Sequence, residues 1–163
     1  MLQNPVALTV FALVVILGDS PWYAPQYAIP LLGMLLGNTM SGIAIALDRL
    51  TQSAWQQRGV IEARLILGEQ ASDAIADLRR QAIRSGLIPI INAMAAAGIV
   101  SLPGMMTGQI LAGGDPMEAA KYQLMILFLI AAGTALGAAS AVLIMSRRLF
   151  DPRQRLRLDR LAG

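Results

Sequence analysis

Cysteine and histidine are both absent from the sequence, and charged residues are scarce. Their absence excludes disulfide frameworks, thiolate chemistry, zinc clusters of the usual kind and histidine general bases. Charged residues make up 14% of the 163 residues, about half the usual globular share, while hydrophobic residues make up 56%. The arginines lie in two blocks without interleaved aromatic residues, so no nucleic-acid partner is expected. This composition indicates a membrane protein in contact with lipid.

Four apolar segments predict membrane helices, because a bilayer-spanning helix needs about 20 apolar residues. They cover residues 5–18, 29–47, 87–112 and 122–145. The first segment lacks the basic flank of a cleaved signal peptide, so we do not expect it to be one. Because it is too short for a full span and starts almost at Met1, we expect the chain to begin part-way into a longer membrane domain. We therefore predict an all-α, multi-pass transmembrane helical bundle, with residues 1–163 as a single domain.

The positions of the arginines predict the orientation, since positively charged connections stay on the cytoplasmic side. The connections at residues 19–28 and 113–121 carry a single basic residue between them, Lys121, and are expected outside. We expect a cell (inner or plasma) membrane location, with the loop at residues 48–86 and the C-terminal tail in the cytoplasm. The arginines of these two regions are Arg49, Arg58, Arg64, Arg79, Arg80 and Arg84 in the loop, and Arg147, Arg148, Arg153, Arg155, Arg157 and Arg160 in the tail.

The cytoplasmic loop has the pattern of amphipathic helix outside the membrane. Its apolar positions recur at steps of three and four residues between charged ones. Gly68 interrupts the pattern, and glycine after a helical run is the commonest left-handed C-terminal stop. We predict two short helices hinged at Gly68; the alternative is a solvated helix end with alternating charges. The apolar positions are Ile61, Leu65, Ile75, Leu78 and Ala82.

Within this loop, "EARLILG" at residues 62–68 has the form E-A-x-x-x-x-G. ABC-transporter permeases carry an E-A-A-x-x-x-G element where their coupling helix meets the ATPase subunit. Arg64 stands in place of the second alanine here. The following "LIP" at residues 87–89 also lies further downstream than in the usual importer pattern.

Neighbouring segments carry a more specific resemblance. "IPLLGMLLGNTMSGIAIALDRL" (29–50), "EARLILG", "VSLPGMMTGQIL" (100–111) and "FLIAAGTALGA" (128–138) together resemble the permease subunit of the iron-export ABC transporter family. That family includes plant proteins linked to aluminium tolerance. The resemblance covers nearly the whole chain from Ile29 onward.

The resemblance implies that the chain corresponds to the C-terminal part of a longer permease. Its implied partners are an ABC ATPase subunit, which binds the ATP, and a second copy of the permease in a homodimer. No cofactor is expected on this chain. The implied ATPase-coupling residues are Glu62, Ala63, Leu67 and Gly68.

An irregular stretch, "GIVSLPGMMTGQILAGG" at residues 98–114, interrupts the third apolar segment. Unpaired backbone groups cost several kcal/mol in hydrocarbon, so such backbone persists only beside protein or a water-filled cavity. We interpret it as a broken helix that lines a translocation path; the alternative is a proline-kinked helix that merely packs well. The candidate path residues here are Ser101, Pro103, Gly104, Met105, Met106 and Gly108.

Polar and small residues add further candidates. Asn38 and Asn92 lie within apolar segments, where they either contact a permeant species or form interhelical hydrogen bonds. Two sets with small-x-x-x-small spacing predict close-packing faces. At the start of the fourth segment, we expect a glycine turn, an Asp115 cap, Pro116 at the first helical position and Glu118 in a box-like start. The small sets are Gly33, Gly37 and Ser41, and Gly133, Gly137 and Ala141.

Residues for catalysis or metal binding are not assigned. The chain has no G-x-x-x-x-G-K-[ST] motif, so ATP must be handled by another polypeptide. Asp48 has no second carboxylate in another apolar segment to form an acid pair. The thioethers of Met94, Met105 and Met106 prefer Cu(I) to iron and are more often packing.

The sequence thus favours a non-enzymatic ABC permease subunit that exports a small solute. Export of a metal ion such as iron is implied by the resemblance alone. The alternative is a non-transporting membrane scaffold or assembly protein.

Overall fold

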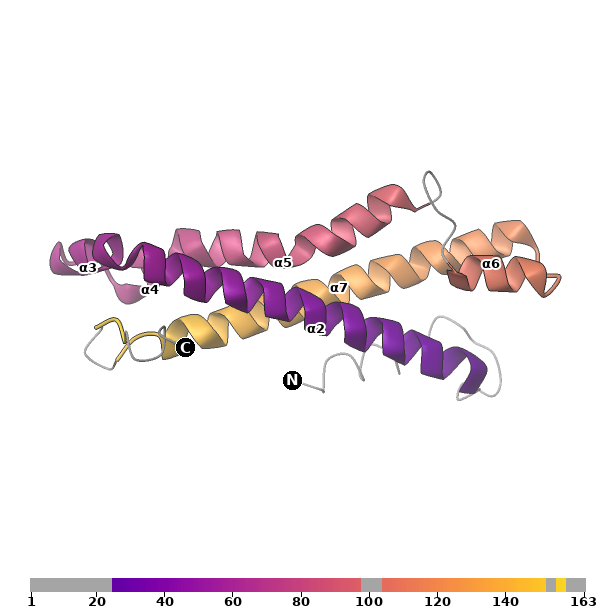
Figure 1. Cartoon of the computed structure of the whole chain (residues 1–163), viewed down its shortest axis with the longest axis horizontal. Helices are drawn as coiled ribbons and strands as arrows, with labels where there is room; N and C mark the ends of the chain where they lie inside the picture. The colour runs from indigo at the N-terminus through magenta and orange to yellow at the C-terminus, as the bar shows by residue number, and fades with distance from the viewer. Residues whose placement is uncertain (1–24, 98–103, 152–154, 158–163) are drawn as a thin grey trace. The chain divides into compact units, whose positions relative to one another are not determined.

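The computed structural model describes residues 25–97, 104–151 and 155–157, and these are almost entirely helical (Figure 1). Within these ranges there is no β-strand, and an isolated antiparallel bridge joins Phe150 and Leu156. The predicted all-α class is confirmed, while the first apolar segment, residues 5–18, lies outside the described residues. The helices are α2 (Pro25–Gln56), α3 (Arg58–Ile66), α4 (Ala71–Ala74), α5 (Ala76–Ala96), α6 (Gly104–Leu111) and α7 (Pro116–Arg148).

Two of the described helices are long and apolar enough to cross a membrane. They are Leu31–Gln56 of α2 and the whole of α7. With 33 residues, α7 is about 50 Å long, more than a hydrocarbon core of about 30 Å requires. The count of four spans stays a prediction, because the third segment divides into α5 and α6, and residues 98–103 between them are not described.

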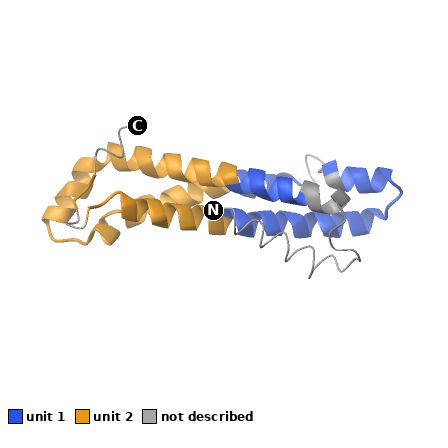
Figure 2. Ribbon diagram, turned by 90° about the horizontal axis from the view of Figure 1, so that it is seen from below, with its two compact units in different colours: residues 1–39, 88–134 blue, residues 40–87, 135–163 orange. Residues whose placement is uncertain are grey.

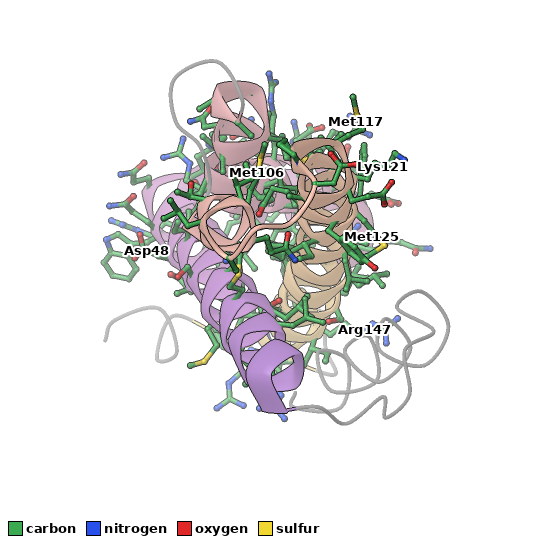
Figure 3. All side chains as sticks on the ribbon, turned by 90° about the vertical axis from the view of Figure 1, so that its right-hand side faces the viewer. Asp48, Met106, Met117, Lys121, Met125 and Arg147 are labelled. Atoms are coloured by element: carbon green, nitrogen blue, oxygen red, sulfur yellow. The ribbon has the colours of Figure 1, made fainter. Side chains whose placement is uncertain are left out.

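The helix that contains the second apolar segment extends beyond the end of that segment at Leu47. The helix α2 continues through Asp48 and Arg49 to Gln56. Both charged side chains are exposed, and Figure 3 labels Asp48 on the outer side of this helix. The hydropathy of the sequence falls at Asp48, where the charged residues begin, but the helix does not end there. Exposed charged side chains leave the backbone hydrogen bonds of the helix intact.

The chain forms two compact units (Figure 2). Unit 1 comprises residues 1–39 and 88–134, and unit 2 comprises residues 40–87 and 135–163. The long helices α2, α5 and α7 contribute to both units. The short helix α6 belongs to unit 1, whereas α3 and α4 belong to unit 2.

The core of unit 2 is apolar and joins the loop helices to the long ones. The amphipathic pattern of the loop is confirmed, because four of its five apolar positions are buried and Leu65 is partly buried. Burial of each Leu or Ile side chain from water contributes about 1.5–3 kcal/mol. The buried cluster consists of Ala46, Leu50, Ala54, Ile61, Ala74, Ile75, Leu78, Ala82, Ala138, Val142 and Leu149.

A close backbone approach in unit 2 depends on Gly86 of α5. A Cβ atom added at Gly86 would lie 2.5 Å from the carbonyl oxygen of Gly42 and 2.9 Å from the Cβ of Ala46, both on α2. Any side chain at this position would push the two helices apart. The sequence prediction of close-packing faces missed this glycine.

The predicted small-residue faces differ in their surroundings. Gly133, Gly137 and Ala141 are buried in α7, as a close-packing face requires. Gly33 and Gly37 are exposed, and a Cβ atom added at either would meet nothing within 4 Å. The close-packing prediction therefore fits the α7 set, and the structure gives Gly33 and Gly37 no such close neighbour.

In unit 1, α2 and α7 each bury one face at three- and four-residue intervals. The opposite face of α7 exposes large apolar side chains, among them Leu124 (55%) and Phe128 (63%). A helix that is apolar on its exposed face as well as its buried face fits a lipid environment. The buried residues of these faces are Leu31, Leu35 and Thr39 of α2, and Ala119, Gln123, Ile126, Leu127, Ile130 and Thr134 of α7.

The start of α7 follows the predicted turn chemistry. Gly113 has a φ of +88°, and the N–H groups of Gly113 and Gly114 donate to the carbonyls of Ile110 and Gln109. The Asp115 carboxylate accepts a 3.1 Å hydrogen bond from the Met117 N–H, and the helix begins at Pro116. The predicted turn, cap and first helical position are confirmed.

The predicted box residue Glu118 has a different partner from the one expected. Its carboxylate accepts a 2.7 Å hydrogen bond from Lys121 Nζ. Met117 and Lys121 lie on the exposed side of this first part of α7 (Figure 3).

Candidate functional site

The loop helices form an elbow, residues 58–74, that turns at Gly68. Gly68 has a φ of +93°, in the left-handed region. Its N–H donates to the Leu65 carbonyl and the Glu69 N–H donates to the Arg64 carbonyl, both at 3.1 Å. This pair of bonds is a Schellman motif, which confirms the predicted left-handed stop. Beyond it, the four-residue α4 and the long α5 take the place of the single short helix that was predicted.

The inner side of the elbow is fixed mainly by apolar contacts. Ile61 of α3 and Ile75, just after α4, are each 1% exposed within the core of unit 2. An ion pair between Arg64 and Asp77 spans 3.9 Å, but both side chains are largely exposed, so it stabilises little. Arg79 adds a 2.8 Å hydrogen bond to the Ser72 carbonyl and so ties α5 to α4.

The outer side of the elbow is an exposed apolar tip, defined here as Val60, Ile66 and Leu67. Ile66 is 85% exposed and Leu67 is 84% exposed. The other predicted coupling residues, Glu62, Ala63 and Gly68, are exposed on the same short segment. Exposed apolar side chains on an otherwise charged helix are typical of a surface that another protein covers.

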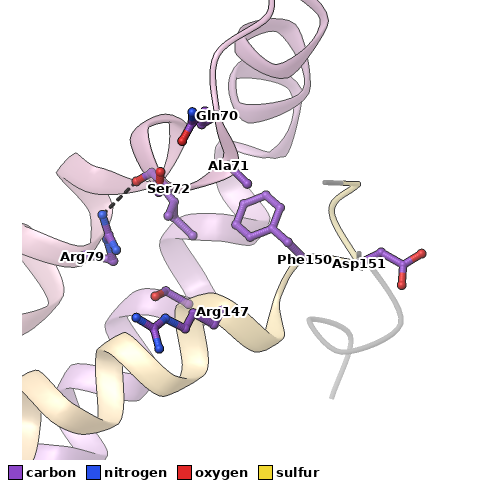
Figure 4. A pocket seen from close by; sticks show the side chains of 9 residues that line it. Gln70, Ala71, Ser72, Arg79, Arg147, Phe150 and Asp151 are labelled. Carbon is purple, nitrogen blue, oxygen red and sulfur yellow. Dashed lines mark hydrogen bonds between the residues drawn. The ribbon is translucent and has the colours of Figure 1, made fainter. Parts of the chain in front are cut away.

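A pocket of about 560 Å³ lies between the elbow and the end of α7, within unit 2 (Figure 4). Arg79 and Arg147 supply positive charge to its lining, and Asp151 supplies one negative charge. Figure 4 shows the Phe150 ring on the side toward Ala71. The elbow and the end of α7 therefore share both a buried core and a polar pocket.

The predicted translocation-path residues do not form one buried group. Asn38 is exposed, and its Nδ2 donates to the Met34 carbonyl of its own helix at 2.8 Å. Asn92, Gly104 and Gly108 are exposed, and Met106 is half-buried. Ser101, Pro103 and the side chain of Met105 lie outside the described residues.

Three buried polar residues were missed by sequence reasoning. Thr39, Gln123 and Thr134 are each at most 5% exposed. Their position on the helix carried a signal: Gln123 and Thr134 are eleven residues apart, which places them about 20° apart around α7. Polarity alone could not separate them from exposed Asn38 and Asn92.

The described residues are almost all helical and include two apolar helices of membrane-spanning length, as in a multi-helical membrane protein. The chain belongs to the Uncharacterised protein family UPF0014, which it matches over residues 1–150. This result confirms the resemblance drawn from its sequence motifs. No solved structure matches the chain.

Three relatives show the range of this family. The chain is 47% identical to the UPF0014 membrane protein slr1647 of Synechocystis over 90% of its length and 56% of the relative. It is 36% identical to the probable iron export permease protein FetB of Escherichia coli, over 91% of its length and 57% of the relative. It is 32% identical to the protein ALUMINUM SENSITIVE 3 of Arabidopsis thaliana, over 90% of its length and 51% of the relative. The chain thus spans about half the length of the curated relatives it matches.

Proposed function

We propose that this chain forms part of the permease of an ABC transporter that exports a small solute, with a metal ion such as iron as the candidate. One observation carries the proposal. The E-A-x-x-x-x-G helix exposes an apolar tip on one side and buries Ile61 in the core that holds the end of α7 on the other. A relative named as a probable iron export permease supports the substrate class.

In this proposal, a separate ATPase subunit binds ATP and docks on the tip. Closure of the ATPase displaces α3, which is only 9 residues and about 13 Å long and so moves as one piece. Ile61 and Leu65 pass the displacement to the core, where Val142 and Leu149 belong to α7 or follow it directly. The chain itself needs no cofactor for this step.

The proposed orientation places the elbow and the end of α7 in the cytoplasm of a cell membrane. Arg147 and Arg148 occupy the last turn of α7. Arginines there favour the cytoplasmic side and also complement the negative end of the helix dipole. A second copy of the permease completes the transporter as a homodimer.

The metal assignment rests on the names of relatives. The described residues contain no group of three or more histidine, cysteine, aspartate or glutamate side chains that could hold a metal ion. A metal ion is therefore proposed as cargo, without a resident site of such ligands in that part of the chain.

The test is ATPase binding by the double variant Ile66→Ser with Leu67→Ser. Both side chains project from the fold, so thermal stability should stay unchanged, while affinity for the co-expressed ATPase subunit should fall at least about tenfold if they form a buried hot spot. Gln57→Ser with Gln70→Ser, two exposed polar positions, one just before the elbow and one within it, is the matched control. Equal binding by both variants would rule out the tip. Failure of any ATPase to bind the unmodified protein would favour the scaffold alternative.

A further inference from the structure

Unit 1 buries polar groups that have no hydrogen-bond partner. Among the described residues, Thr39 Oγ1, Thr134 Oγ1 and both polar atoms of the Gln123 amide are buried and unbonded. Buried Ser146 differs, because its hydroxyl donates to the Leu143 carbonyl at 2.9 Å. Each unsatisfied buried group costs about 1–3 kcal/mol relative to one that is paired.

The three residues lie on the inward faces of the two membrane-length helices. On α7, Gln123 and Thr134 are separated by roughly 16 Å along the axis and by about 20° around it. Buried Ile126, Leu127 and Ile130 fill the same face between them. In α2 and α7 respectively, Thr39 and Thr134 are the last residues of unit 1. The inward face therefore carries polar groups at two levels, separated by apolar residues.

The chemistry of these groups limits what they can bind. The buried polar side chains of the described residues are Thr39, Ser53, Gln123, Thr134 and Ser146, and none of these is charged. A bare ion on this face would lack a compensating charge, at a cost of several kcal/mol. Water differs, because it donates and accepts hydrogen bonds, as do a primary amide and a hydroxyl.

We propose that Thr39, Gln123 and Thr134 form a hydrated lining of the translocation path and bind the water shell of the transported ion. Hydration of this face stands on the unpartnered groups alone. The role in binding the water shell of an ion rests on the proposed transport function. Water on this face supplies the missing partners of the amide and hydroxyl groups, and an ion that keeps its shell needs no charged ligand there.

Thiol accessibility tests the hydration directly, since the chain contains no cysteine. Gln123→Cys and Thr134→Cys are made separately in the full chain in native membranes and treated with a small charged methanethiosulfonate. Phe128→Cys, on the exposed apolar face of α7, is the matched control. The thiolate attacks the reagent, forming a mixed disulfide and releasing methanesulfinate, and the thiolate forms only where water is present, so the two buried positions should react at least about tenfold faster than position 128. Equal or slower reaction at both buried positions would overturn the proposal.

A stability measurement covers the case in which the cysteine variants fail to fold. Thr134→Val keeps the side-chain shape and removes the hydroxyl, so the melting temperature in detergent should stay equal or rise if no protein group pairs with that hydroxyl. Ser146→Ala removes a paired hydroxyl and should lower it. A larger fall for Thr134→Val than for Ser146→Ala would show a structural hydrogen bond and overturn the proposal.

A transport assay tests the ion-binding part of the proposal separately from the hydration part. Inside-out vesicles with the complete transporter are assayed for ATP-driven uptake of Fe²⁺ or Mn²⁺. Gln123→Leu and Thr134→Val should each lower uptake about tenfold, as for the loss of one hydrogen bond, while ATPase binding is retained. Full uptake by both variants would overturn the ion-binding role. If the unmodified protein moves neither ion, the proposed function fails for these ions, and thiol accessibility still decides the hydration.

Discussion

The two units differ in what they bury. Unit 2 buries a continuous apolar cluster, and its buried Ser146 is hydrogen-bonded within its own helix. Unit 1 buries Thr39, Gln123 and Thr134 with unbonded polar atoms. A tightly packed core without unpaired polar groups can transmit a displacement, whereas the unpaired polar groups of unit 1 are a cost that stability alone does not explain. Unit 2 is therefore suited to coupling, and unit 1 is suited to a polar passage.

Replacement of Gly86 by a larger residue should cause the largest loss of stability, and it tests how tightly unit 2 is packed. In Gly86→Leu, even the first side-chain atom would overlap the Gly42 carbonyl oxygen on α2. The cost should exceed the ~1–3 kcal/mol typical of overpacking, because backbone cannot move aside as a flexible side chain can. The measurement is the yield of monodisperse protein and its melting temperature in detergent.

The control for that substitution is Gly33→Leu in unit 1. A Cβ atom at Gly33 meets nothing within 4 Å, so this variant should fold as the unmodified protein does. Similar losses for the two variants would mean that the crossing at Gly86 is no tighter than the surroundings of Gly33.

Truncation of a core side chain in unit 2 should have the next largest effect. Ile75 is 1% exposed, so Ile75→Ala should lower the free energy of unfolding by about 2–5 kcal/mol. For Thr134→Val in unit 1 we expect the opposite result, because that substitution should leave the stability unchanged or raise it. Thermal melting of both variants decides it, and a neutral Ile75→Ala would remove the distinction between the two interiors.

Sequence reasoning was most successful in the charged loop and at the turn before α7. The spacing of Ile61 and Leu78 predicted their burial, because a helix in water must place its apolar residues on one face. Gly68 and Asp115 act through local backbone geometry, which the sequence contains directly. These features require no knowledge of which helices meet.

The same reasoning was less successful in the apolar segments and at their edges, where Gly86 lies just before the third segment. Gly86 and Gly33 look alike in sequence, and only the pairing of α5 with α2 distinguishes them. The helix α7 is apolar on all sides, so hydropathy could not show that Gln123 faces inward. In lipid, the apolar pattern no longer marks the buried face, and polar residues can be placed only when the neighbouring helices are known.

The smallest effect is expected from the exposed ion pair of the elbow, and it tests which contacts hold the elbow in place. Arg64 and Asp77 are 3.9 Å apart, and their side chains are 41% and 66% exposed. Asp77→Asn should therefore change stability by only about 0–1 kcal/mol, since water and salt screen such a pair. ATPase binding at the tip should be unchanged, because Ile61 still anchors α3 in the core. Binding and melting are measured at low and high salt. A large, salt-sensitive loss of ATPase binding would mean that charge positions the elbow, and the apolar core would then lose its proposed role as the coupling element.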